Sequence, residues 1–138
     1  MLLLTFDDVD IYERDLNNFQ DGCWLNDSCI NYCFRKFDRK YSNHKLVLMD
    51  PTVVSFLLIQ ASDEEDLEEL YVNLQIDKRT WLLAPLTNRE TFSEASTHWS
   101  LLLCHICSGK FFHFDSSGSY NETSSIRVAN KIAQLIKK

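Results

Sequence analysis

Two residues that could do acid–base chemistry stand at opposite ends of one apolar stretch, THWSLLLCHICSGKFFHFDS, which occupies residues 97–116. His98 heads the first apolar run of this stretch, and Asp115 closes the second. An aspartate that accepts a hydrogen bond from one imidazole nitrogen fixes the tautomer of the histidine and leaves the other nitrogen to take a proton from a nucleophile. The two residues therefore indicate half of a catalytic triad if the strands bring their side chains together.

Whether the two side chains meet depends on the length of the loop between the two strands. A two-residue turn at residues 108–109 places Asp115 opposite Leu102, roughly 14 Å along the strand from His98. A four-residue loop at residues 106–109 reduces the offset to two residues, or roughly 7 Å, and keeps both side chains on one face of the sheet. The sequence allows both loops, so it does not decide whether His98 and Asp115 form a hydrogen bond.

Three helices are expected before these strands. Each begins with residues typical of a helix N-terminus. These residues are Asn26 or Asp27 for the first helix, Asp50 with Pro51 for the second, and a capping box of Ser62 and Glu65 for the third. The expected apolar faces are Ile30, Phe34, Phe37 and Tyr41 in the first helix, residues 53–59 in the second, and Leu67, Leu70, Tyr71 and Leu74 in the third. This spacing is typical of amphipathic helices that pack on a core.

The second half of the chain predicts strands followed by one helix. Short apolar and aromatic runs at residues 80–86, 98–107 and 110–114 are typical of neighbouring core strands. A helix is expected to start at Ser124 or Ser125, with a shared apolar face of Ile126, Ala129, Ile132, Ala133 and Ile136. Helices first, strands second and a helix last predict an α+β fold, and we expect one domain over residues 1–138.

Charge and composition exclude several classes of function. The chain has 138 residues and a formal net charge of −6, much of it from the acidic run at residues 62–70, so we expect no nucleic-acid partner. No apolar run approaches the roughly 20 residues that a membrane span needs, and the first ten residues do not form a secretory signal. We therefore expect no membrane partner and a cytoplasmic or nuclear location, where the five cysteines stay reduced.

Three short motifs together resemble the sentrin and Ulp-type cysteine proteases, and they are most similar to the deneddylase branch of that family. They are WLND at residues 24–27, THWSLL at residues 97–102 and FFHFDS at residues 111–116. The resemblance extends over residues 21–138. It implies a papain-like α+β fold with N-terminal helices, a mainly antiparallel sheet and a last helix, incomplete at its C-terminal end.

The same resemblance implies an activity and a partner. Members of the family hydrolyse the bond after the C-terminal Gly-Gly of a ubiquitin-like modifier, and they need neither a cofactor nor a metal. We expect a Nedd-type modifier as the first choice of partner and SUMO as the second. We also expect the chain to be a monomer.

Five residues of this chain receive roles from the resemblance. His98 is implied to be the catalytic histidine and Asp115 the aspartate that orients it. Trp24 and Trp99 are implied to form a tunnel over the diglycine tail of the modifier, with Asp27 near that tail. A Gly-Gly segment has no side chains, so two indole faces can clamp it where any larger residue would clash. Selection for the tail is then steric.

The nucleophile is the part of the family pattern that is missing from this chain. The family's nucleophilic cysteine lies C-terminal to the aspartate, in a segment that also supplies an oxyanion-hole glutamine. No cysteine follows Asp115 in this chain. We therefore expect a truncated product, a fragment, or an inactive relative that binds a modifier without cleaving it.

Two other uses of the cysteines stay open in the sequence. Cys23 precedes an expected helix, as the nucleophile of papain does, and a helix N-terminus lowers the pKa of a thiol. Cys104 and Cys107 form a C-x-x-C pair that resembles half of a zinc site, but zinc usually needs a second pair and this chain has none. We expect a nucleophilic Cys23 and a structural zinc to be the weaker interpretations.

Overall fold

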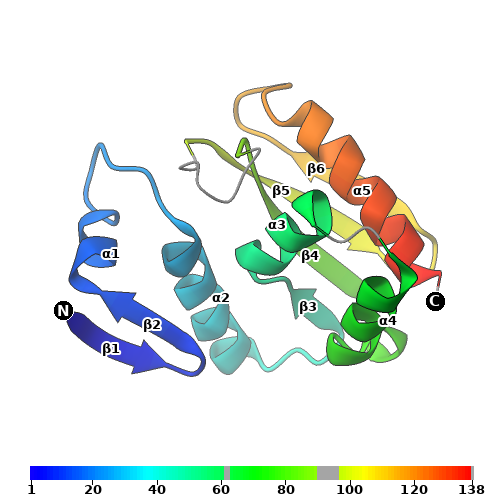
Figure 1. Ribbon diagram of the computed structural model, residues 1–138, viewed down its shortest axis with the longest axis horizontal. Helices are drawn as coiled ribbons and strands as arrows, with labels where there is room; N and C mark the ends of the chain where they lie inside the picture. Colours follow the sequence, from blue (N-terminus) through cyan, green and yellow to red (C-terminus); the bar gives the residue numbers. More distant parts are fainter. Residues whose placement is uncertain (61–62, 90–96, 138) are drawn as a thin grey trace.

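The computed structural model describes residues 1–60, 63–89 and 97–137. Figure 1 shows a four-stranded sheet with helices against it and a two-stranded hairpin beside helix α2. The elements in chain order are β1 (Leu2–Phe6), β2 (Val9–Tyr12), α1 (Glu13–Asn17), α2 (Asp27–Tyr41), β3 (Leu46–Leu48), α3 (Pro51–Ile59), α4 (Glu64–Asn73), a 3₁₀ turn (Ile76–Lys78), β4 (Trp81–Thr87), β5 (Trp99–His105), β6 (Lys110–Phe114) and α5 (Glu122–Ile136). The predicted α+β fold class is confirmed.

The four-stranded sheet has the order β3-β4-β5-β6. β3 runs parallel to β4, whereas β4, β5 and β6 are antiparallel to their neighbours. His105 pairs with Lys110, so the loop between β5 and β6 has four residues, 106–109. Leu101 pairs with Phe114, and the strands therefore take the shorter of the two offsets between His98 and Asp115 that the sequence allowed.

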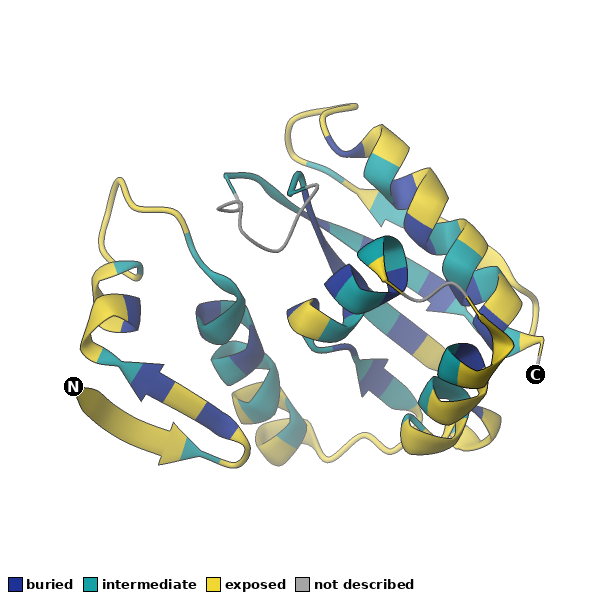
Figure 2. Ribbon diagram, viewed as in Figure 1, coloured by how far each residue is buried: buried dark blue, intermediate teal, exposed yellow. Residues whose placement is uncertain are grey.

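One face of the sheet is covered by α3, α4 and α5 and forms the hydrophobic core (Figures 1 and 2). Alternate residues of β4 and β5 point to this covered face because side chains alternate along a strand. The buried side chains on the sheet are Leu82, Ala84, Leu86, Leu102 and Cys104, and those on the helices include Leu57, Leu67, Val128, Ile132 and Leu135. The core therefore lies between the sheet and the three helices, and its residues come from positions 47 to 135 of the chain.

The opposite face of the sheet is also apolar, but it is only partly covered. Leu83, Leu101 and Leu103 are half-buried there, and Phe112 and Phe114 of β6 are exposed. α2 lies across from this face, and the space between them forms two cavities of about 730 and 640 Å³ that both contact Phe34. We call these two cavities together the apolar groove.

Helix α2 begins where the sequence predicted, with the side chain of Asn26 accepting a hydrogen bond from the backbone N–H of Cys29. The expected apolar stripe is less buried than predicted. Ile30 and Phe34 are half-buried, whereas Phe37 and Tyr41 are exposed at the apolar groove. The fully buried residues of α2 are instead Cys29, whose thiol donates to the carbonyl oxygen of Asp15 in α1, and Asn31, whose side chain donates to Asp50 at the start of α3.

Two predicted helix starts differ from the structure. The side chain of Asp63 caps α4, and Ser62 lies outside the described residues. α5 begins at Glu122, with Asn121 as its N-cap residue, rather than at Ser124 or Ser125. Ile126 is exposed because the buried face of α5 is shifted to Ser125, Val128, Ile132 and Leu135.

The hairpin of β1 and β2, the short helix α1 and the strand β3 were not predicted. The hairpin turns at Asp7, whose positive φ of 54° is uncommon for a residue other than glycine. β3 has only three residues, and its pairing with β4 comes from tertiary contact rather than from a local pattern. Within the described part of the chain, no helix has both the length and the apolar character needed to cross a membrane.

Candidate active site

The structure brings His98 and Asp115 into direct contact at the end of the sheet. Nε2 of His98 lies 2.6 Å from Oδ1 of Asp115. The two side chains are only 15% and 2% exposed, so water competes little for this hydrogen bond. The contact follows from the four-residue loop, which places both residues on the covered face of the sheet.

Backbone groups hold the Asp115 carboxylate in place. The N–H of Ser117 donates to Oδ1 and the N–H of Asn121 donates to Oδ2, each at 2.9 Å. Burial of the carboxyl opposes its ionisation, but the N–H groups of Asn121 and Ser117 and the imidazole of His98 outweigh this effect and lower the pKa of Asp115 to about 2. An ionised carboxylate can only accept hydrogen bonds, so Nε2 of His98 is the donor in this contact, and in a neutral imidazole Nδ1 is then the nitrogen with the lone pair.

Three residues that the sequence analysis did not single out surround this pair. The side chain of Asn121 is buried and donates to Oγ of Ser100 at 3.0 Å, which anchors the start of α5 to β5. Oδ1 of Asn88 accepts from the backbone N–H of His98 at 3.1 Å. The ring of Tyr120 lies 4.8 Å from the His98 ring. These contacts could not be predicted from the sequence, because the partners lie ten or more residues apart and meet only in the folded chain.

Lowering the pH is expected to destabilise the chain through Asp115. The carboxyl has a pKa of about 2 in the folded chain and an ordinary value of 3.8. Between these values the unfolded chain binds a proton that the folded chain does not, so the contribution of Asp115 is complete above about pH 4 and is lost as the pH falls to about 2. Urea unfolding at pH 2 to 6 measures the free energy of unfolding of the wild type and of Asp115→Asn. The difference between the two proteins should shrink as the pH falls from about 4 to about 2. Equal pH slopes in the two proteins would contradict the assignment.

The residues expected around a diglycine tail are held near each other but not as a closed tunnel. The indole N–H of Trp99 donates to the carbonyl oxygen of Leu25 at 2.8 Å, which ties β5 to the segment before α2. Trp24 is 62% exposed, and the two indoles line different cavities. Asp27 shares the cavity of Trp24 and accepts a hydrogen bond from Arg89, a residue that the sequence analysis did not identify.

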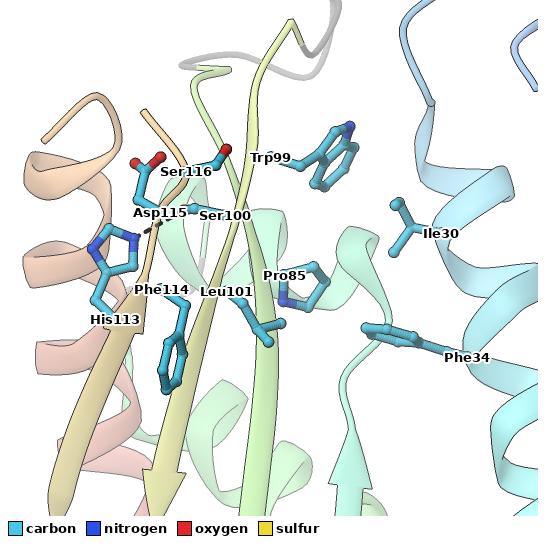
Figure 3. Close-up of a pocket in the computed structure, with 10 residues that line it drawn as sticks. All are labelled: Ile30, Phe34, Pro85, Trp99, Ser100, Leu101, His113, Phe114, Asp115 and Ser116. Carbon is cyan, nitrogen blue, oxygen red and sulfur yellow. Dashed lines mark hydrogen bonds between the residues drawn. The ribbon is translucent and has the colours of Figure 1, made fainter. Parts of the chain in front are cut away.

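Figure 3 shows the larger cavity of the apolar groove, with Trp99 and Asp115 at one end. Ile30 and Phe34 point from α2 toward the sheet, and Leu101 of β5 and Phe114 of β6 line the same cavity on the side of the sheet. Most of the surface of this lining is apolar, and its polar residues lie at the end near Asp115. An apolar space therefore extends from the aspartate of the pair along the open face of the sheet.

The five cysteines occupy different environments, and no hydrogen bond joins any of them to His98 within the described residues. Cys29 and Cys104 are buried, and burial raises the pKa of both thiols, that of Cys104 to about 11. Cys33 is partly buried and its pKa is also raised by burial. Cys107 is exposed in the loop at the other end of β5, and Cys23 is exposed in the cavity beside Trp24.

The C-x-x-C pair is split by the end of β5. Cys104 points into the core, whereas Cys107 is exposed in the following loop. Two zinc ligands must each bring a sulfur to about 2.3 Å from the same ion, so a thiol in the core and a thiol at the surface do not favour a shared metal site. Among the described residues, no group of three or more His, Cys, Asp or Glu side chains could hold a metal ion.

Residues 23–138 match the Ulp1 protease family, C-terminal catalytic domain. The chain is 26% identical to a probable sentrin-specific protease 8 of Dictyostelium discoideum, over 98% of this chain and 59% of that protein. It is 23% identical to NEDD8-specific protease 1 of Arabidopsis thaliana, over 97% of this chain and 60% of that protein.

A solved structure of the SUMO protease Ulp1, with its catalytic cysteine oxidised to a sulfenic acid, has the same fold, with a TM-score of 0.71 at 19% identity, over 99% of this chain and 60% of that one. The chain thus spans about three fifths of the length of these relatives. The family match covers most of the chain, including both residues of the His98–Asp115 pair. This chain belongs to the Ulp1 protease family.

Proposed function

We propose that this chain is the part of a cysteine peptidase that supplies the general base, His98, and the surface that binds the C-terminal tail of the substrate. We call this surface, formed by Trp24, Asp27 and Trp99, the wall for the substrate tail. The proposed substrate is a ubiquitin-like modifier, NEDD8 first and SUMO second, cleaved after its C-terminal Gly-Gly. The observation that carries the proposal is the 2.6 Å hydrogen bond between the shielded side chains of His98 and Asp115. A structural ion pair would not need the imidazole to keep a free nitrogen, whereas a general base does.

The proposed reaction uses Nδ1 of His98 in two rounds of proton transfer, one for each half of the reaction. Nδ1 of His98 takes the proton of a cysteine thiol, and the thiolate attacks the carbonyl carbon of the last glycine. The resulting imidazolium, stabilised by Asp115, then gives its proton to the leaving amine as the C–N bond breaks. Water hydrolyses the remaining thioester, with His98 again accepting and returning a proton.

We propose that the nucleophile comes from residues that follow Lys138 in a longer product of the same gene. No hydrogen bond joins His98 to a cysteine among the described residues, and three of the five cysteines have a pKa raised by burial, which disfavours the reactive thiolate. The apolar groove supports the proposal because it is an open apolar space that reaches Asp115. An apolar segment bound there would lie next to the end of β6, which leads into Asp115.

A modifier that carries a C-terminal electrophile tests the missing nucleophile directly. NEDD8 with a C-terminal vinyl sulfone should not label the 138-residue chain, because the chain offers no activated thiol beside His98. The same probe should label a longer product at a cysteine beyond Lys138, and intact-mass analysis followed by peptide mapping would identify the position. Labelling of the 138-residue chain at Cys23 would overturn the proposal.

The second candidate function is to bind a modifier without cleaving it. Trp24 favours this candidate because a large indole that is 62% exposed is typical of a contact surface. A longer product that binds NEDD8 but is never labelled by the probe would support binding alone. Labelling of the longer product would instead support the peptidase.

A further inference from the structure

Arg89 joins three elements that are far apart in the sequence. It is the second residue after β4, and its Nη2 donates to Oδ2 of Asp27 at 2.9 Å. The same nitrogen also donates to Oγ of Ser55 in α3. The Arg89 and Asp27 side chains are only 10% and 18% exposed. The contact therefore links the sheet, α3 and the first residue of α2 in a place where water screens charge poorly.

Asp27 depends on this contact for its charge balance. Its other carboxylate oxygen, Oδ1, is buried and has no hydrogen-bond partner among the described residues. Removing one partner of a buried ion pair leaves the other charge without compensation, which is far more costly than losing an exposed pair. Arg89 can make both contacts because its guanidinium presents several N–H donors in a fixed plane, which a lysine does not have.

The same short segment of chain is tied to the sheet at a second point. Asp27 is the last residue of the segment Trp24–Asp27, and the carbonyl of Leu25 within that segment accepts from the indole of Trp99 at 2.8 Å. The arginine contact and the indole contact thus hold one four-residue segment against β4 and β5. The residue before Arg89 also takes part, because Asn88 accepts a hydrogen bond from the backbone of His98.

We propose that Arg89 is a positioning residue that sets the place of the segment Trp24–Asp27 relative to His98. Two adjacent residues after β4 then position the two parts of the site. Asn88 accepts a hydrogen bond from the backbone of His98, and Arg89 pairs with Asp27 of the wall for the substrate tail. The role in substrate binding rests on the proposed function. The mechanical link between Arg89 and the tryptophan wall does not, so the two can be tested separately.

The link can be tested in the 138-residue chain by NMR of the tryptophan side chains. Arg89→Met should move the indole N–H signal of Trp99, because the loosened segment weakens the hydrogen bond to Leu25. The signal of Trp81, on the same sheet but far from Arg89 along β4, should stay in place. Arg89→Lys keeps the positive charge, and it should move the Trp99 signal in the same direction by a smaller amount.

The matched control for this experiment is Arg39→Met. Arg39 also pairs with an aspartate, Asp7, but the arginine is mostly exposed and the pair joins α2 to the N-terminal hairpin. This variant should leave the Trp99 signal unchanged. An unchanged Trp99 signal in folded Arg89→Met or Arg89→Lys protein would overturn the proposed link.

Binding of NEDD8 tests the consequence for the substrate tail. Arg89→Met should weaken binding of NEDD8 that ends in Gly-Gly by about tenfold or more, since small displacements of positioning groups have large effects. Binding of NEDD8 that lacks the last two glycines should be unchanged. Equal loss for both forms would show a general structural effect and overturn the positioning role. If the wild-type chain binds neither form, the proposed function fails, while the NMR result still decides the link.

Discussion

Replacing His98 with glutamine in the longer product is expected to lower kcat/KM for a NEDD8 precursor by on the order of 10³-fold or more. Glutamine fills similar space but cannot take the proton of a thiol. The buried hydrogen bond to Asp115 shows why the effect should be large: the carboxylate holds one nitrogen of the ring, so the other nitrogen is the only base at this position. Cleavage of a NEDD8 precursor with a C-terminal extension, followed by gel electrophoresis, measures the loss.

His105 provides the matched control for this substitution. It lies at the other end of β5, where its ring bonds to Oγ of Ser108 at 2.7 Å. His105→Gln should therefore cleave the precursor at nearly the wild-type rate. His98→Gln protein should still bind NEDD8, since the imidazole is not part of the wall for the tail. Full activity in His98→Gln would contradict the assignment of the base.

The helices that could be predicted from the sequence are those whose signals are local. Asn26 caps α2, and Asp50 with Pro51 starts α3, because a cap and the first turn of a helix involve residues only a few positions apart. The register of β5 and β6 could not be predicted in the same way. Both loop lengths suit the segment around Gly109, and the choice between them depends on pairing along both strands.

The site was predictable in part for the same reason. His98 and Asp115 stand out because they border one hairpin, and the resemblance to a known family supplied their roles. Arg89 has no such signal, since its partner Asp27 lies 62 positions away and an arginine after a strand is common. The exposure of Phe37 and Tyr41 was also unpredictable: an apolar stripe indicates that a helix packs on something, but it does not show whether the partner is present in the same chain.

One face of the sheet is covered by helices and the other is open, so substitutions on the covered face should have the larger effect on stability. Leu102 is 2% exposed and points into the core under α5. Leu102→Ala should lower the free energy of unfolding of the 138-residue chain by about 2–5 kcal/mol, because it removes buried methyl groups and leaves a cavity. Phe112 lies on the open face and is 46% exposed. Phe112→Ala should cost only about 1 kcal/mol, since roughly half of the ring already contacts water. Urea unfolding of both variants measures the difference.

Comparing the stability losses of Phe112→Ala and Leu102→Ala also tests whether anything packs on the open face of the sheet. If two copies of the chain pack through it, Phe112→Ala should cost as much as Leu102→Ala, and the loss should grow with protein concentration. A small loss that does not depend on concentration supports an open face in the isolated chain. In the longer product, the cost of Phe112→Ala should rise toward that of Leu102→Ala if added residues bind along the apolar groove. If the cost of Phe112→Ala is the same in the longer product, the added residues do not bind along the apolar groove. The nucleophile would then have to reach His98 by another route.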